Sequence, residues 1–118
     1  LRCIMKKPDD KARLKHMLDA ALDAREFLGK ATFEDLQRDR KLGNAIVRSL
    51  EIIGEAAANV TKTTQAKYPE IEWTVIIGMR NRLIHAYFDI NYHIVWQTVK
   101  ENLPPLIEQL QSILQNSE

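Results

Sequence analysis

Apolar residues recur at three- and four-residue steps along most of this chain, the spacing of one buried face of an α-helix. The first such stretch lies between Asp9 or Asp10, either of which can cap a helix, and Gly29, a residue typical of helix ends. The pattern therefore predicts an amphipathic helix that ends near Gly29. Its predicted core stripe consists of Leu14, Met17, Leu18, Ala21, Leu22, Ala24, Phe27 and Leu28.

The following stretch predicts a short helix and then a long one. Thr32, with Glu34 and Asp35 close behind it, starts the short segment. The long helix is expected from about Asp39 to about Thr63. Its predicted core stripe consists of Leu42, Ile46, Val47, Leu50, Ile53, Ala57 and Val60.

Proline ends the long helix and separates it from the next one. Tyr68-Pro69 breaks the helix because proline lacks an N–H donor and disfavours helical geometry in the residue before it. A fourth helix is then expected from about Glu72 to Tyr87. Its buried side is predicted to carry Val75, Ile76, Met79, Leu83 and Ala86.

The last third of the chain predicts two more helical segments. Asp89 and Asn91 offer caps for a helix from Tyr92 to Leu103, and Pro104-Pro105 should kink this helix or restart it as a final segment. Apolar residues of that segment are Leu106, Ile107, Leu110 and Leu114. No stretch alternates convincingly between apolar and polar residues, so no strand is predicted. The sequence thus predicts one domain over residues 1–118, an all-α, up-and-down bundle of four to five main helices.

Composition and charge narrow the functional classes. Seventeen basic and sixteen acidic residues leave a net charge of +1, too balanced to grip long nucleic acid through the overall field, so such contact must be local. Cys3 is the single cysteine, which excludes an intrachain disulfide and suits a reducing compartment. No apolar run approaches the roughly 20 residues that cross a bilayer, and the N-terminal segment lacks the apolar stretch of a secretion signal. We therefore expect a cytoplasmic protein without a membrane partner.

Candidate chemistry is concentrated between residues 78 and 88, where Arg80, Asn81, Arg82, His85 and Tyr87 lie close together. A guanidinium holds phosphate through parallel hydrogen bonds, and an imidazole takes or gives a proton near neutral pH. A phenol stacks on a base or acts as a nucleophile. The segment therefore predicts a nucleic-acid or nucleotide site.

A charged strip on the long helix permits two interpretations. Glu51 and Glu55 lie one turn apart and Arg48 is within reach of both, which favours an intrahelical ion-pair ladder. Alternatively the strip borders the site and orients Arg80 or His85. The three histidines are scattered without ligand spacing to a cysteine or carboxylate, and no glycine-rich phosphate loop exists. We therefore predict no metal site and no cofactor.

Three blocks of sequence carry a resemblance to a known family. Arg80, His85 and Tyr87 follow the order Arg, four residues, His, one residue, Tyr. Upstream lie Arg48 and Leu-Glu-Ile-Ile-Gly-Glu-Ala-Ala over 50–57, and downstream lies Val-Trp-Gln-Thr over 95–98. With these blocks, nearly the whole chain closely resembles the HepT toxins of the HEPN superfamily.

The resemblance implies a small HEPN-like homodimer that is a metal-independent endoribonuclease, the toxin of a prokaryotic toxin–antitoxin pair. Arg80 and His85 would be catalytic, and Asn81 would support them. The antitoxin would be a minimal nucleotidyltransferase that neutralises the toxin by transferring AMP from ATP to Tyr87. Transfer RNA and messenger RNA are both candidate substrates.

Helix geometry leaves open how Arg80 and His85 could share one pocket. At about 100° per residue, the two side chains point roughly 140° apart on a regular helix. Either the helix unwinds near His85, or Arg80 swings its long side chain around, or a second subunit completes the pocket across a two-fold axis. A second class of function, a non-catalytic helical subunit that partners a nucleotidyltransferase, needs no general base at His85.

Overall fold

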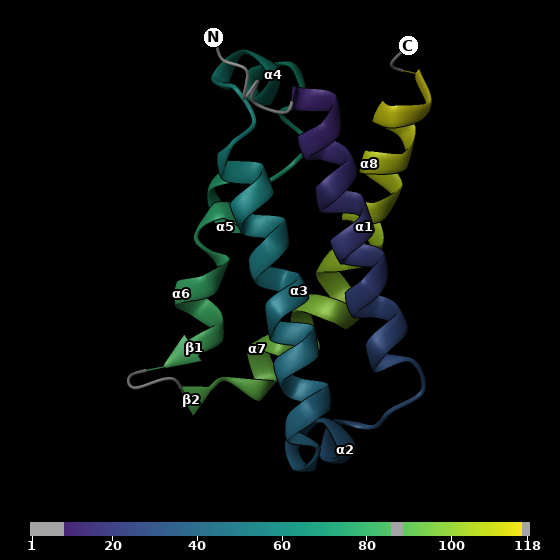
Figure 1. Ribbon diagram of the computed structural model, residues 1–118, viewed down its shortest axis with the longest axis vertical. Helices are drawn as coiled ribbons and strands as arrows, with labels where there is room; N and C mark the ends of the chain where they lie inside the picture. The colour runs from purple at the N-terminus through teal and green to yellow at the C-terminus, as the bar shows by residue number, and fades with distance from the viewer. Residues whose placement is uncertain (1–8, 86–88, 117–118) are drawn as a thin grey trace, which may run out of the picture.

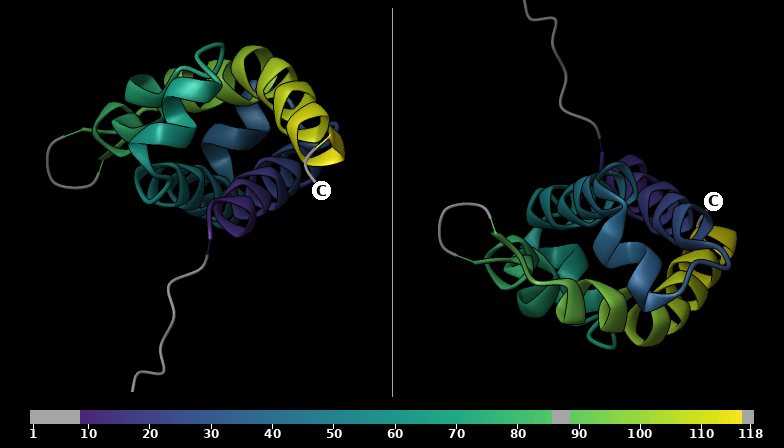
Figure 2. Two further views of the ribbon diagram at one scale, coloured as in Figure 1. Left: turned by 90° about the horizontal axis from the view of Figure 1, so that it is seen from above. Right: turned by 90° about the horizontal axis from the view of Figure 1, so that it is seen from below.

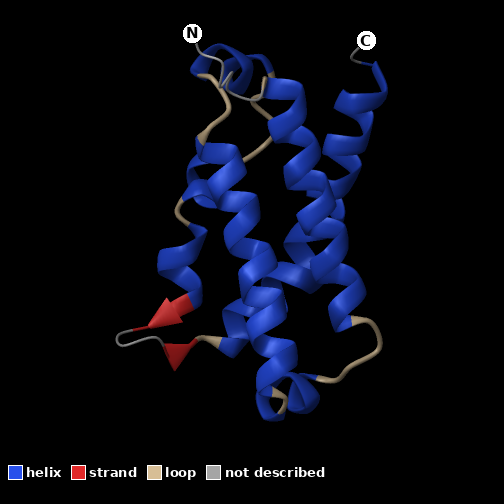
Figure 3. Ribbon diagram, in the orientation of Figure 1, coloured by secondary structure: helices blue, strands red, loops and turns tan. Residues whose placement is uncertain are grey.

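The computed structural model describes residues 9–85 and 89–116, and for Ile84 and His85 the description covers the backbone only. Within these ranges the chain is a bundle of helices that run up and down its long axis, with a short hairpin at one side (Figure 1, Figure 3). The predicted all-α class is confirmed. No helix in the described ranges combines the length and the apolar character that a membrane crossing requires.

Two long helices form the centre of the bundle. Helix α1 (Asp10–Leu28) packs along α3 (Arg40–Ala58), and α1 also contacts α8 (Leu103–Asn116). On its other side α3 contacts α5 (Trp73–Ile77) and α6 (Met79–Leu83). Seen along the long axis, these helices surround a common core, and α2 (Phe33–Arg38) lies across one end of it (Figure 2).

Local capping sets where most helices begin, as the sequence predicted. The side chain of Asp9 accepts a hydrogen bond from Ala12 N at 2.9 Å, at the start of α1. Thr32 and Asp35 form a capping box at the start of α2. Asp39 caps α3, and Gly29 ends α1 with a positive φ of 50° that a side chain would strain.

The predicted apolar stripes supply most of the core. Leu14, Met17, Ile46, Leu50, Ile53, Leu83, Ile107 and Leu110 are all buried. Phe27 and Val75 were predicted to be buried and are instead 45% and 44% exposed. Phe27 precedes the buried Leu28, and Val75 precedes the buried Ile76. Because neighbours on a helix point about 100° apart, the side chain before each buried residue points out of the core. Ala86 lies outside the described residues.

The third helix ends earlier than the sequence predicts, at Ala58 rather than near Thr63. A tertiary contact causes the break, because the carboxylate of Asp10 accepts hydrogen bonds from Thr61 N at 3.0 Å and from Thr61 Oγ1 at 2.6 Å. Thr64 Oγ1 donates to the same carboxylate. Thr61 then caps a separate short helix, α4 (Lys62–Lys67).

The predicted fourth helix, from Glu72 to Tyr87, is also divided. Gly78 separates α5 from α6, and after Leu83 the backbone becomes extended as β1 (Ile84–His85). This strand pairs antiparallel with β2 (Asp89–Ile90), with Ile84 opposite Ile90 and His85 opposite Asp89. The expectation of no strand was therefore wrong for four residues. The hairpin is closed by Asn91 N, which donates to Leu83 O at 2.7 Å.

The last helical run contains a wide turn. Asn91 caps α7 (Tyr92–Gln97), a π-helical segment η2 (Thr98–Asn102) follows, and α8 continues from Leu103. The N–H of Leu103 donates to Thr98 O, five residues earlier. Pro104 and Pro105 lie in the first turn of α8, where their missing N–H groups are tolerated. The sequence predicted a kink or a restart of the helix at Pro104-Pro105. The structure has a widened turn immediately before these prolines.

Candidate functional site

The structure brings the motif segment to the surface beside α3. Arg80, Asn81 and Arg82 lie on α6 and are exposed, and the helix ends at Leu83. The backbone of His85 is extended rather than helical. Of the three arrangements that helix geometry left open, unwinding near His85 is therefore the one that the backbone adopts. Tyr87 lies outside the described residues.

Arg80 is held by a carboxylate from the neighbouring helix. Its Nε donates to Glu51 Oε2 at 2.8 Å, across 29 residues of sequence. The two side chains differ in their surroundings, because Arg80 is 60% exposed and Glu51 only 14%. A charge-assisted hydrogen bond of this length is among the stronger polar contacts in proteins. The contact fixes the base of the guanidinium to α3.

The charged strip on α3 forms the predicted ion-pair ladder and also contacts α6. Arg48 Nη1 lies 3.1 Å from Glu55 Oε2 and 3.7 Å from Glu51 Oε1, so the intrahelical ladder exists. The same ladder reaches Arg80 through the other oxygen of Glu51. Arg48 and Glu55 are exposed, whereas Glu51 is the half-buried member that connects the two helices.

A small hollow of about 200 Å³ opens beside this ion-pair chain. It is lined by Glu51, Gly54, Glu55, Ala58, Ile77 and Arg80. Two of the α3 residues that line it, Gly54 and Ala58, are small and lie one turn apart. Sequence reasoning did not identify this hollow, although two small residues at a four-residue spacing on a polar helix face were the available signal. Ile77, an apolar residue, is 36% exposed at its edge.

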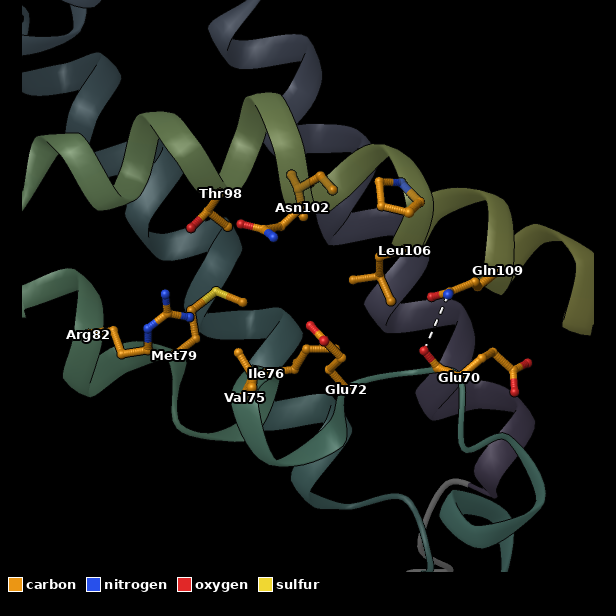
Figure 4. Close-up of a pocket in the computed structure, with 12 residues that line it drawn as sticks. Glu70, Glu72, Val75, Ile76, Met79, Arg82, Thr98, Asn102, Leu106 and Gln109 are labelled. Carbon is orange, nitrogen blue, oxygen red and sulfur yellow. Dashed lines mark hydrogen bonds between the residues drawn. The ribbon is translucent and has the colours of Figure 1, made fainter.

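Arg82 serves a different surface from Arg80. It lines a second hollow of about 260 Å³, between α5–α6 on one side and η2–α8 on the other (Figure 4). Ile76, Met79 and Leu106 are apolar and buried there. At the far end of this hollow Gln109 Nε2 donates to Glu70 O at 3.3 Å. Residues two apart on a helix point to opposite sides, so only one of the two arginines can join the Glu51 strip.

The other two histidines, His16 on α1 and His93 on α7, are exposed. The ring of His93 lies against Phe33, with centroids 4.7 Å apart, and Phe33 meets Trp96 edge-on at 5.8 Å. These aromatic contacts attach α2 to α7. They support packing rather than catalysis.

The site thus consists of an arginine on a carboxylate anchor beside a hollow, followed five residues later in the sequence by a histidine whose backbone is extended. The sequence of this chain matches a family model that is described as Ribonuclease HepT-like, over residues 17–113. The chain belongs to this family. It is of the HEPN type, for which an all-α fold is expected.

Several relatives are similar over nearly their whole length. A protein of Caldanaerobacter subterraneus subsp. tengcongensis, named as an RNase by inference, is 43% identical over 102 residues, 86% of this chain and 91% of the relative. The "Probable ribonuclease HepT" of Thermococcus cleftensis is 40% identical over 100 residues, 85% of this chain and 91% of that one. A Methanocaldococcus jannaschii protein, also named as an RNase by inference, is 37% identical over 114 residues, 97% and 94% of the two chains. No solved structure matches.

Proposed function

We propose that this chain is a metal-independent endoribonuclease toxin in which Arg80 and His85 act on one phosphodiester bond of RNA. The observation that most directly supports this function is the end of α6. Arg80 remains helical and is anchored on Glu51, whereas the backbone at His85 is extended. The side chains of the two residues are therefore not required to point 140° apart, as they would on a regular helix. Membership of the family and the names of the relatives support the same reaction.

The reaction needs few groups because RNA carries its own nucleophile. His85 takes the proton of the ribose 2′-hydroxyl, and the 2′ oxygen forms a bond to phosphorus while the bond to the 5′ oxygen breaks. The leaving 5′ oxygen takes up a proton from water, and His85 later returns the proton that it took to the solvent. The products are a 2′,3′-cyclic phosphate and a 5′-hydroxyl end, and no step calls for a metal ion.

Arg80 stabilises the charge that develops on the phosphate oxygens. Its Nε is occupied by Glu51, and this contact does not engage the two terminal nitrogens. These nitrogens carry the remaining N–H donors in the planar fork that matches phosphate. A well-placed donor of this kind contributes about 3 kcal/mol to a transition state that gains negative charge.

Two partners complete the proposal. A second copy of the chain packs beside α5 and α6, where Ile77 leaves apolar surface exposed at the hollow that Arg80 lines. A minimal nucleotidyltransferase acts as antitoxin and transfers AMP to Tyr87. The added bulk and negative charge keep RNA away from Arg80, which explains inhibition without any change of fold.

The test is RNA cleavage by the purified protein in the presence of EDTA, with the chemistry of the new ends determined. We expect cyclic phosphate and 5′-hydroxyl ends from the wild-type chain, none from His85→Ala, and fewer by about a hundredfold or more from Arg80→Ala. His16→Ala, which removes an exposed histidine elsewhere, is the matched control and should cleave normally. Normal cleavage by His85→Ala would refute the catalytic assignment. A wild-type chain that binds the nucleotidyltransferase yet cuts no RNA would favour the non-catalytic binding subunit.

A further inference from the structure

We infer that Glu51 is the positioning residue of the site, and that it sets the direction in which the Arg80 guanidinium presents its terminal nitrogens to the scissile phosphate. The inference rests on the proposed ribonuclease function. It gives Glu51 a role in orienting a catalytic group, which is distinct from binding RNA. The contact that supports it is the 2.8 Å hydrogen bond between Arg80 Nε and Glu51 Oε2.

The difference in burial shows which partner is the anchor. Glu51 is 14% exposed and lies on the long helix α3, whereas Arg80 is 60% exposed on the five-residue helix α6. A carboxylate that is largely withdrawn from water makes a stronger and better-defined hydrogen bond than a surface pair. The exposed pair of Arg48 and Glu55 is the comparison, because contacts of that kind contribute little on their own.

The charge balance of the strip also argues for orientation over attraction. Two guanidiniums, of Arg48 and Arg80, are matched by two carboxylates, of Glu51 and Glu55. Such a group has no net charge with which to draw RNA towards it. What Glu51 supplies is direction, since each of its oxygens faces one arginine.

The nitrogen of the Arg80 guanidinium that binds Glu51 determines which of its N–H groups remain available to bind the substrate phosphate. A carboxylate that took both terminal nitrogens would occupy the fork that binds phosphate. The contact at Nε instead leaves that fork available, beside the hollow that Gly54 and Ala58 line. Arg80 can therefore be held by α3 and hold a phosphate at the same time.

Steady-state cleavage by Glu51→Gln tests the inference. Glutamine keeps one acceptor oxygen but removes the negative charge that strengthens the hydrogen bond, so kcat should fall about tenfold or more. KM should stay unchanged or fall, because a negative charge has been removed next to an anionic substrate. The control is Glu108→Gln, which makes the same charge change on α8 and should retain normal kcat and KM. A normal kcat for Glu51→Gln, or a rise in KM alone, would overturn the inference.

A second measurement needs no RNA and so separates this inference from the ribonuclease proposal. The Nε–H signal of Arg80 in a proton–nitrogen NMR spectrum can be assigned by its absence in Arg80→Ala. We expect slow exchange with water in the wild-type protein and faster exchange, with a shifted signal, in Glu51→Gln at an unchanged melting temperature. An Arg80 signal that Glu51→Gln leaves unmoved would overturn the inference. If the wild-type chain cuts no RNA, the ribonuclease proposal fails, whatever this signal does.

Discussion

Gly54 on α3 lies directly against the backbone of Ile76 on α5. A Cβ atom on Gly54 would come within 2.9 Å of the carbonyl oxygen of Ile76, closer than such atoms approach in proteins. This close approach sets the spacing between α3 and the α5–α6 segment. It therefore also determines where Arg80 meets Glu51.

We predict that Gly54→Ala destabilises the fold by about 1 to 3 kcal/mol, because the obstacle is backbone and cannot move aside as a side chain could. Urea denaturation would measure the change. Alanine has the higher helix propensity, so any net loss must come from the clash. Gly78→Ala is the control, since its Cβ would stand 3.4 Å from Thr74 O, an ordinary contact, and stability should barely change. Equal stability of both variants would contradict this account of the packing.

Asp10 gives the fold a dependence on acid pH. Hydrogen bonds from Thr61 and Thr64 hold the pKa of its carboxyl below the ordinary value of 3.8. Because the pKa is depressed in the folded state, the stabilisation is present above the unfolded pKa and is lost as pH falls through the folded one. Asp10→Asn should therefore be less stable than wild type near neutral pH, and the gap in melting temperature should close towards pH 2. Asp19→Asn, at an exposed position of the same helix, should track the wild-type protein across the range.

The two arginines of α6 should differ sharply in function. Arg80→Ala removes the guanidinium that Glu51 anchors, and we expect RNA cleavage to fall by about a hundredfold or more. Arg82→Ala removes the same charge from the opposite side of the helix, where it lines the second hollow, and cleavage should stay within about threefold of normal. Rates of single-turnover cleavage at equal protein concentration would measure both. Equal losses would indicate that general positive charge, not the placement of Arg80, supports the reaction.

If AMP transfer to Tyr87 neutralises the chain as proposed, Tyr87→Phe should resist the nucleotidyltransferase, because this variant lacks the proposed acceptor hydroxyl. Co-expression with the nucleotidyltransferase should rescue growth for the wild-type chain and fail for this variant. Mass spectrometry should find the AMP increment on the wild-type chain and on Tyr92→Phe, a matched loss of a hydroxyl nearby. An AMP group on Tyr87→Phe would place the modification elsewhere.

Local signals predicted the starts of the helices well, because caps act within one turn. Asp9, Thr32 and Asn91 cap the helices that their positions indicated. The early end of α3 could not be predicted in that way. It depends on Asp10 meeting Thr61, a contact across 51 residues that no local pattern encodes.

The site was predictable in its residue types but not in its connections. Spacing alone placed Glu51 within reach of Arg48, whereas no local pattern determined how far α6 would lie from α3. The ladder is confirmed, and Glu51 also contacts Arg80; that the strip orients a catalytic group stays a prediction. The hairpin after Leu83 was missed because two-residue strands are too short to produce an alternating pattern.

The wide turn of η2 constrains the length of the chain as well as its composition. Each residue added to or removed from a helix rotates everything after it by about 100°. A π turn holds one residue more than an α turn, so if one residue were deleted between Gln97 and Pro104, ordinary α-helical pairing could resume with the apolar side of α8 still facing α1. A residue inserted into α8 after Pro105 has no such compensation and would turn Leu110 away from the core, so this insertion should be tolerated far less well than the deletion.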